Sequence, residues 1–94
     1  MHGEYKVPDG KLVVIDLEIV DGRLRRVELS GDFFLLPEDA IWRLTEAIEG
    51  APADVSDDEL IRRVQQAAQG AELIGITPEG VAHAVRRAAA GEAV

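Results

Sequence analysis

The sequence of 94 residues lacks cysteine entirely, which excludes a disulfide framework, a thiolate metal site and a thiol nucleophile. It also lacks any long hydrophobic run: the longest uninterrupted apolar stretches, at residues 12–15 and 33–36, are far too short to span a bilayer. No basic segment followed by an apolar one marks the chain for export. We therefore expect a cytoplasmic protein that does not associate with membranes.

Basic residues are scarce relative to acidic ones. Eighteen Asp and Glu outnumber ten Lys and Arg, which gives a formal net charge of −8. A surface with this balance repels phosphate backbones, so we expect no nucleic-acid partner. Only two of the bases are lysines, Lys6 and Lys11, and both flank the turn predicted by Pro8, Asp9 and Gly10.

The first third of the sequence has the two-residue periodicity of strands. Residues 4–7 form a short extended segment, and residues 11–20 are rich in β-branched side chains with apolar residues at alternate positions. Residues 23–30 form the second strand of a hairpin with residues 11–20. Residues 33–36 form a further short strand beyond a kink at residues 30–32. These segments predict an antiparallel sheet of three or four strands.

The register of the central hairpin follows from its apolar residues. Asp21-Gly22 is the strongest short signal for a two-residue type I′ turn. Uninterrupted pairing from that turn would place Arg26 opposite the apolar Leu17, whereas one extra residue near Arg26 pairs Leu17 with Val27. The sequence therefore predicts a β-bulge at this point.

The rest of the chain has helical periodicity, with three start signals. The first helix is expected over residues 37–49, because proline favours the first helical position and a glycine follows the last one. The second is expected to begin at Ser56, with a capping box in which Ser56 caps the amide of Glu59 and Glu59 reaches back. The third is expected to begin at Thr77, with Pro78 just inside it.

A hairpin sheet followed by three helices packed on it defines the α+β class. The length fits one domain, so we expect residues 1–94 to form a single domain. Trp42 lies beside the apolar stripe of the first helix, and we expect its side chain in the core; an exposed interface anchor is the alternative.

Groups that could perform chemistry are few. Ser30 and Ser56 occupy a turn and a helix cap, and His2 and His83 are far apart in the sequence. No nucleophile therefore stands beside a base, and no metal-ligand spacing is present. We expect no catalytic residue and no cofactor bound by this chain alone.

Lys6 and Lys11 form a compact positive point on an acidic chain. Lysine is a usual partner of phosphate, so this point is suited to a place near a nucleotide or an acyl-adenylate. Ordinary solvated lysines at strand ends explain it equally well.

The segment Gly31-Asp32-Phe33-Phe34 also has two interpretations. Its glycine permits a kink, its aspartate can accept hydrogen bonds from local amides, and two aromatics exceed what a short edge strand needs. A turn followed by core aromatics is the alternative.

These two segments carry a family resemblance. Residues 4–13 read EYKVPDGKLV and resemble the opening of the C-terminal accessory domain of lipoate–protein ligases, whose pattern is close to K-x-P-x-G-K-L-V. Residues 30–34 read SGDFF and resemble the G-D-F-F segment that ends the second long strand of that domain. The order of elements is similar too, up to the LIGITPE entry of the last helix at residues 73–79.

The resemblance implies a function. Such ligases use ATP to make lipoyl-adenylate and then pass the lipoyl group to a lysine of an acceptor domain. Their larger domain holds ATP and lipoate, and the accessory domain supports the activation step; in some organisms the two are separate polypeptides. The chain begins at Met1, directly before the domain, so we expect the separate small subunit, in a heterodimer with a large catalytic subunit.

In that heterodimer the catalytic subunit would hold ATP, Mg²⁺ and lipoate, and the small subunit would meet lipoyl-acceptor domains only indirectly. The resemblance implies that Lys6, Lys11, Gly31, Asp32 and Phe33 face the active site of the partner.

One departure from the family pattern is Asp9, which stands where a second glycine is common and adds a negative charge beside the lysines. The acyl substrate, lipoate or a relative such as octanoate, is set by the catalytic subunit. Two other classes of function stay open at this point: a protein-interaction module unrelated to lipoate, and a small ligand-sensing domain.

Overall fold

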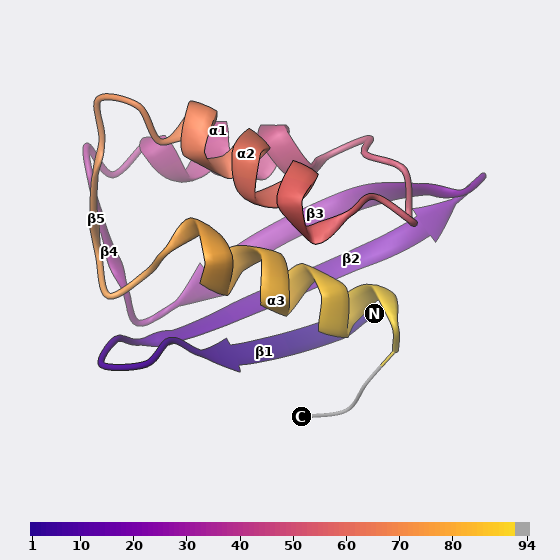
Figure 1. Cartoon of the computed structure of the whole chain (residues 1–94), viewed down its shortest axis with the longest axis horizontal. Helices are drawn as coiled ribbons and strands as arrows, with labels where there is room; N and C mark the ends of the chain where they lie inside the picture. Colours follow the sequence, from indigo (N-terminus) through magenta and orange to yellow (C-terminus); the bar gives the residue numbers. More distant parts are fainter. Residues whose placement is uncertain (92–94) are drawn as a thin grey trace.

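The computed structural model describes residues 1–91. Its elements, in chain order, are β1 (His2–Lys6), β2 (Leu12–Val20), β3 (Arg23–Gly31), β4 (Phe34–Leu36), α1 (Ala40–Ile48), α2 (Asp57–Ala67), β5 (Glu72–Ile74) and α3 (Pro78–Ala89). β1, β2 and β3 form an antiparallel sheet in that order, and the helices lie on one face of it (Figure 1). The predicted α+β class is confirmed.

The fourth strand does not join the hairpin sheet. β4 pairs instead with β5 in a separate two-stranded ribbon, with Phe34 opposite Ile74 and Leu36 opposite Glu72. β5 was not expected from the sequence, because three residues are too few to show an alternating pattern. It forms because β4 offers it a partner.

The predicted bulge is confirmed. The turn is of type I′, with φ of 53° at Asp21 and 74° at Gly22. The pairing of β2 with β3 shifts between Asp16 and Glu18, and Arg26 adopts a φ of 53°. Beyond the shift, apolar residues of both strands again share the core face of the sheet.

The bulge leaves two backbone amides pointing away from β2, and one side chain accepts both. The carboxylate of Glu49 lies 3.1 Å from the amide nitrogen of Arg26 and 3.0 Å from that of Val27. Because Glu49 is the C-cap of α1, these bonds join the end of the helix to the edge of the sheet.

The start of the first helix was predicted too early. Residues 37–39 form a turn, and α1 begins at Ala40. The amides of Ala40, Ile41 and Trp42 bond to carbonyls three residues back, at 3.0, 3.3 and 3.1 Å. Bonds of this spacing wind more tightly than an α-helix, so residues 37–39, which accept them, form a turn that leads into α1.

The caps of the other helices largely follow the prediction. Ser56 Oγ accepts from the amide of Glu59 at 3.1 Å, and Thr77 Oγ1 accepts from the amide of Gly80 at 2.9 Å. The second half of the capping box is wrong, because the Glu59 carboxylate turns to Arg62 and Arg63, at 2.7 and 2.9 Å. Two guanidinium groups one turn along the helix compete successfully with one backbone amide.

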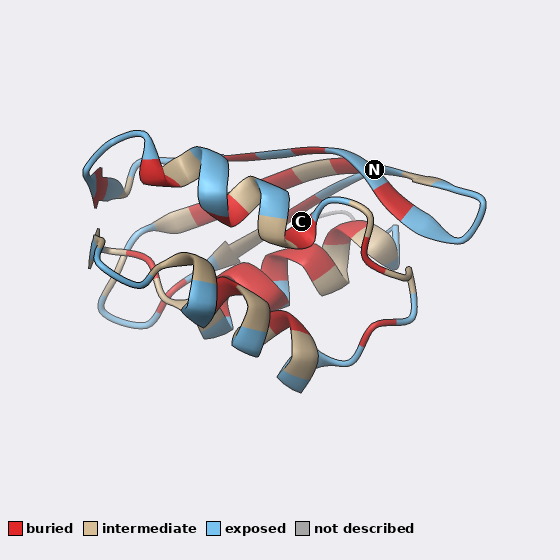
Figure 2. Ribbon diagram, turned by 90° about the horizontal axis from the view of Figure 1, so that it is seen from above, coloured by how far each residue is buried: buried red, intermediate tan, exposed pale blue. Residues whose placement is uncertain are grey.

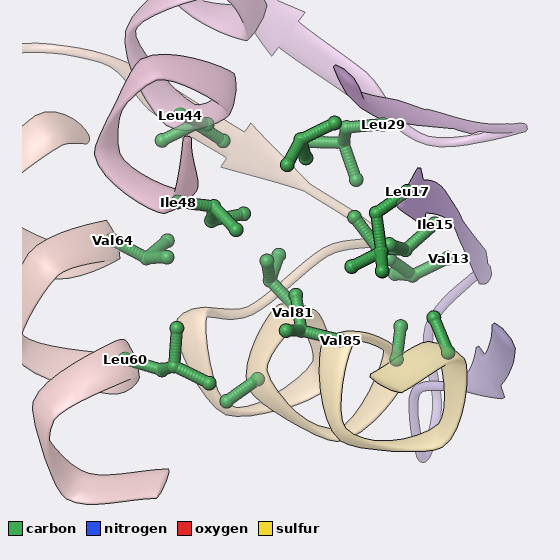
Figure 3. Packing of buried hydrophobic residues seen from close by; sticks show 14 of the residues in the cluster. Val13, Ile15, Leu17, Leu29, Leu44, Ile48, Leu60, Val64, Val81 and Val85 are labelled. Atoms are coloured by element: carbon green, nitrogen blue, oxygen red, sulfur yellow. The ribbon is translucent and has the colours of Figure 1, made fainter. Parts of the chain in front are cut away.

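The core lies between the sheet and the helices. Figure 3 shows side chains of β2 and β3 facing those of α1, α2 and α3, and Figure 2 shows that each helix turns a buried side inward and an exposed side outward. Trp42 is not part of this core: its exposed fraction is 68%, which corrects the prediction. Ala40, Leu44 and Ile48 are the buried residues of α1, and Trp42 lies on another side of the helix.

Candidate functional site

The segments singled out in the sequence meet at one end of the sheet. The turn between β1 and β2, the kink after β3 and the connection from β5 to α3 lie together there (Figure 1). Two hydrogen bonds join them: the Lys11 amide donates to the Gly75 carbonyl at 2.8 Å, and the Leu12 amide donates to Asp32 Oδ1 at 3.1 Å. Lys11 and Asp32 are therefore held at neighbouring positions by the backbone.

Gly31 makes the kink possible. It pairs with Val13 at the end of β3 and has a φ of 148°, which side-chain-bearing residues rarely adopt. A Cβ atom at this position would lie 2.2 Å from the Leu12 carbonyl oxygen and 2.9 Å from the ring of Phe33. Phe33 itself is half-buried and packs against the core. Phe34 is 65% exposed, so the alternative of core aromatics holds in part for Phe33 and is wrong for Phe34.

Gly75 belongs to the same end, and the sequence did not single it out as a site residue. Its φ is 82°, and a Cβ atom here would lie 2.5 Å from Lys11 Cγ. The Lys11 side chain therefore leaves the sheet across the bare backbone of Gly75. The glycine is visible in the sequence, but the pairing with Lys11 joins distant segments and leaves no local pattern.

The two lysines differ in how they are held. The Lys6 ammonium folds back on its own turn and donates to the Val7 carbonyl at 3.0 Å. The backbone of Lys11 makes bonds on both sides, since its carbonyl also accepts from the Val7 amide at 3.1 Å. Lys11 is thus the more firmly placed, and its side chain is exposed.

Asp9 adopts a φ of 58°, the left-handed conformation that glycine accepts most readily and that aspartate tolerates better than most residues. This explains how an aspartate can occupy the position at which the family that the sequence resembles commonly has a second glycine.

The groups with perturbed titration lie away from this end. Hydrogen bonds to Glu4 and Asp16, both at 2.7 Å, raise the pKa of His2 on the open face of the sheet. Hydrogen bonds from Arg62 and Arg63 lower the pKa of Glu59 on α2. Both clusters are side-chain pairings at the surface, so the pKa shifts mark no acid–base centre.

Two further findings concern the described residues 1–91. They contain no group of three His, Asp or Glu side chains that could hold a metal ion. None of their helices is both long and apolar enough to cross a membrane.

The fold and this end of the sheet define a small α+β domain that presents a lysine beside a carboxylate. No protein-family model matches the chain. The chain is 33% identical over 75 residues to lipoate-protein ligase A subunit 2 of Thermoplasma acidophilum, a match that covers 80% of this chain and 77% of that protein. The chain belongs to this family.

A solved structure agrees. One chain from the archaeal bipartite lipoate protein ligase and its E2 lipoyl domain, also from Thermoplasma acidophilum, superimposes with a TM-score of 0.74 at 30% identity. The superposition covers 92% of this chain and 93% of that one. The order of elements implied by the resemblance therefore extends over almost the whole molecule.

Proposed function

We propose that this chain is the accessory subunit of a bipartite lipoate–protein ligase and supports the activation of lipoate to lipoyl-AMP by a separate catalytic subunit. ATP, Mg²⁺ and lipoate bind to that subunit, and the lipoyl group then passes to acceptor domains in the cytoplasm. Family membership supports the proposal that the chain is an accessory subunit. The position of Lys11 supports the proposal that it acts in the activation step.

Lys11 supports this role because its backbone is fixed and its ammonium is free to reach outward. The main chain is bonded at both its amide and its carbonyl, and the side chain crosses Gly75. An ammonium held this way stabilises negative charge on a phosphate or an acyl-adenylate at the subunit boundary. Asp32 Oδ1 accepts a hydrogen bond from the Leu12 amide, and this bond positions the neighbouring Lys11.

The experiment compares two half-reactions in the assembled two-subunit enzyme. A charge-assisted contact to phosphate contributes about 1.5–3 kcal/mol, or roughly one to two orders of magnitude in rate if it acts in the transition state. Lys11→Ala is therefore expected to slow lipoate-dependent pyrophosphate release by about 10- to 100-fold. Transfer from preformed lipoyl-adenylate to the acceptor lysine should change little.

Lys6→Ala is the matched control, because the Lys6 ammonium is already engaged with the Val7 carbonyl. It should slow activation less than Lys11→Ala does. Equal loss in both half-reactions would indicate weakened assembly rather than a role in activation. Robust pyrophosphate release by the isolated chain would refute the accessory role itself.

A further inference from the structure

On each edge of the main sheet, some outward-facing backbone groups bond to other parts of the chain. On β1, the Arg87 guanidinium donates to the Glu4 carbonyl at 2.8 Å. On β3, Leu24 exchanges backbone bonds with Gly50 and Ala51, and Glu49 accepts from the bulge. Groups that cover edge strands in this way prevent pairing with other chains.

One stretch of β3 has no such cover within the described residues. The Leu17 amide donates to the Met1 carbonyl, so Leu17 and, two residues earlier, Ile15 point their backbone groups toward the β1 side. Leu29 lies opposite Ile15 and must therefore point its N–H and C=O off the outer edge of the sheet. No backbone bond from Leu29 to a segment outside the sheet is present in residues 1–91.

A groove runs beside this open edge. It has a volume of about 300 Å³ and lies between residues 27–30 of β3 and Ile41, Trp42 and Thr45 of α1. A second hollow of about 250 Å³ lies next to it along β4, and Ile41 lines both. The groove therefore combines free backbone groups with apolar walls, which is what an added strand requires.

Large apolar side chains stand exposed along the two hollows. Trp42 is 68% exposed, Phe34 65% and Leu36 49%. Aromatic residues of this kind are the usual anchors of protein interfaces. The surface, which we call the Trp42 groove, also adjoins the kink at Gly31 and Phe33, at the end of the sheet that carries Lys11.

The charge of the residues that line the two hollows indicates which kind of segment can bind there. The only ionisable residues that line the two hollows are Glu28 and Glu38, and neither forms an ion pair in the described part of the chain. The chain as a whole carries −8, which disfavours pairing of this surface with a second copy of itself. The groove suits an extended segment that carries apolar and basic side chains.

We propose that the Trp42 groove is the docking site for an extended, apolar and basic segment of the catalytic subunit, which adds as a strand to β3 at Leu29 and covers Trp42 and Phe34. This inference rests on the proposed function, because it takes the catalytic subunit as the partner. It adds where the partner binds and what chemistry the bound segment has.

The test measures binding of the purified catalytic subunit by titration calorimetry. Trp42→Ser and Phe34→Ser remove exposed anchors, so they should weaken binding by about 30-fold or more without lowering the melting temperature. Val20→Ser is the matched control: Val20 is 47% exposed but lies beside the hairpin turn, and binding should change less than about 3-fold.

Two further measurements address the geometry and the charge. Hydrogen exchange of the complex should show slowed exchange at the Leu29 amide and no change at the Glu4 amide on the opposite edge. Replacing both Glu28 and Glu38 by lysine should weaken binding and reverse its salt dependence. Asp54→Lys, at an exposed residue of the loop between α1 and α2, changes the net charge as much as either single variant, Glu28→Lys or Glu38→Lys, and is the control for each of them.

The outcomes separate the inference from the proposed function. If the Trp42 and Phe34 variants bind and stimulate the catalytic subunit like the wild type, the groove is not the docking site and the proposed function stands. If the isolated chain dimerises and Trp42→Ser dissociates the dimer, the occupant is a second copy and the inference is overturned. If the wild-type chain neither binds nor stimulates the catalytic subunit, the proposed function and this inference fall together.

Discussion

The carboxylate of Glu49 stabilises the β-bulge, and its removal is a sharp test of how this sheet is held. Glu49→Ala leaves the amides of Arg26 and Val27 without their acceptor. Hydrogen bonds to a charged group contribute about 1.5–3 kcal/mol each, but the bond at Arg26 is exposed and water replaces most of it. The carboxylate also stands at the C-terminus of α1, where the helix dipole disfavours it by a few tenths of a kcal/mol.

The net loss expected for Glu49→Ala is therefore about 1.5–2.5 kcal/mol in the free energy of unfolding. In a chain of this size, about 1 kcal/mol corresponds to roughly 4–8 °C in melting temperature. Urea unfolding followed by circular dichroism measures the first quantity, and a thermal scan measures the second.

Two variants sharpen this test. Glu46→Ala removes an exposed carboxylate of the same helix. The side chain of Glu46 has no hydrogen bond or ion pair within residues 1–91, so the change should stay within about 0.5 kcal/mol. Glu49→Gln keeps one acceptor oxygen but turns an NH₂ donor toward the second amide, so it should lose most of the stabilisation. Equal stability of Glu49→Ala and Glu46→Ala would refute the reasoning.

Three further predictions concern other parts of the fold. Gly31→Ala should lower the free energy of unfolding by more than about 3 kcal/mol, because it combines backbone strain with a Cβ atom 2.2 Å from the Leu12 carbonyl oxygen. Gly70→Ala is the control: Gly70 has a φ of 81° but open space around it, so the loss should be only about 1 kcal/mol. Ser56→Ala should cost about 1 kcal/mol through loss of the cap of α2, as measured by the same unfolding assay. The raised pKa of His2 stabilises the fold fully below the ordinary value of 6.5 and is lost as pH rises through the folded-state pKa, so His2→Gln should flatten the decline in melting temperature above about pH 6.5. A pH profile unchanged by His2→Gln would contradict this assignment.

Local patterns in the sequence predicted the elements whose cause is local. The bulge followed from the apolar register of two adjacent strands, and the caps at Ser56 and Thr77 followed from residue type and spacing. β5 could not be predicted, because it exists only through pairing with β4. Trp42 was placed wrongly because it lies close to the apolar stripe of α1, and only the packing of the helix decides which side is covered.

The candidate site was predictable in its residue types but not in its assembly. Lys11, Gly31 and Asp32 were found through two short motifs, and the structure brings them together through the Leu12 amide. Gly75 lies far along the sequence from Lys11, and no spacing rule connects them. Lys6 and Lys11 flank one turn, but their side chains are held differently.

The bond between the Lys11 amide and the Gly75 carbonyl has a consequence for synthesis of the protein. It closes a loop that contains most of the chain, so it cannot form until the ribosome has released residue 75. The hairpin of β2 and β3 contains only local contacts and can form much earlier. During translation the lysine end is therefore completed only after the segment with Gly75 has emerged, whereas all residues of the β2–β3 hairpin emerge much earlier.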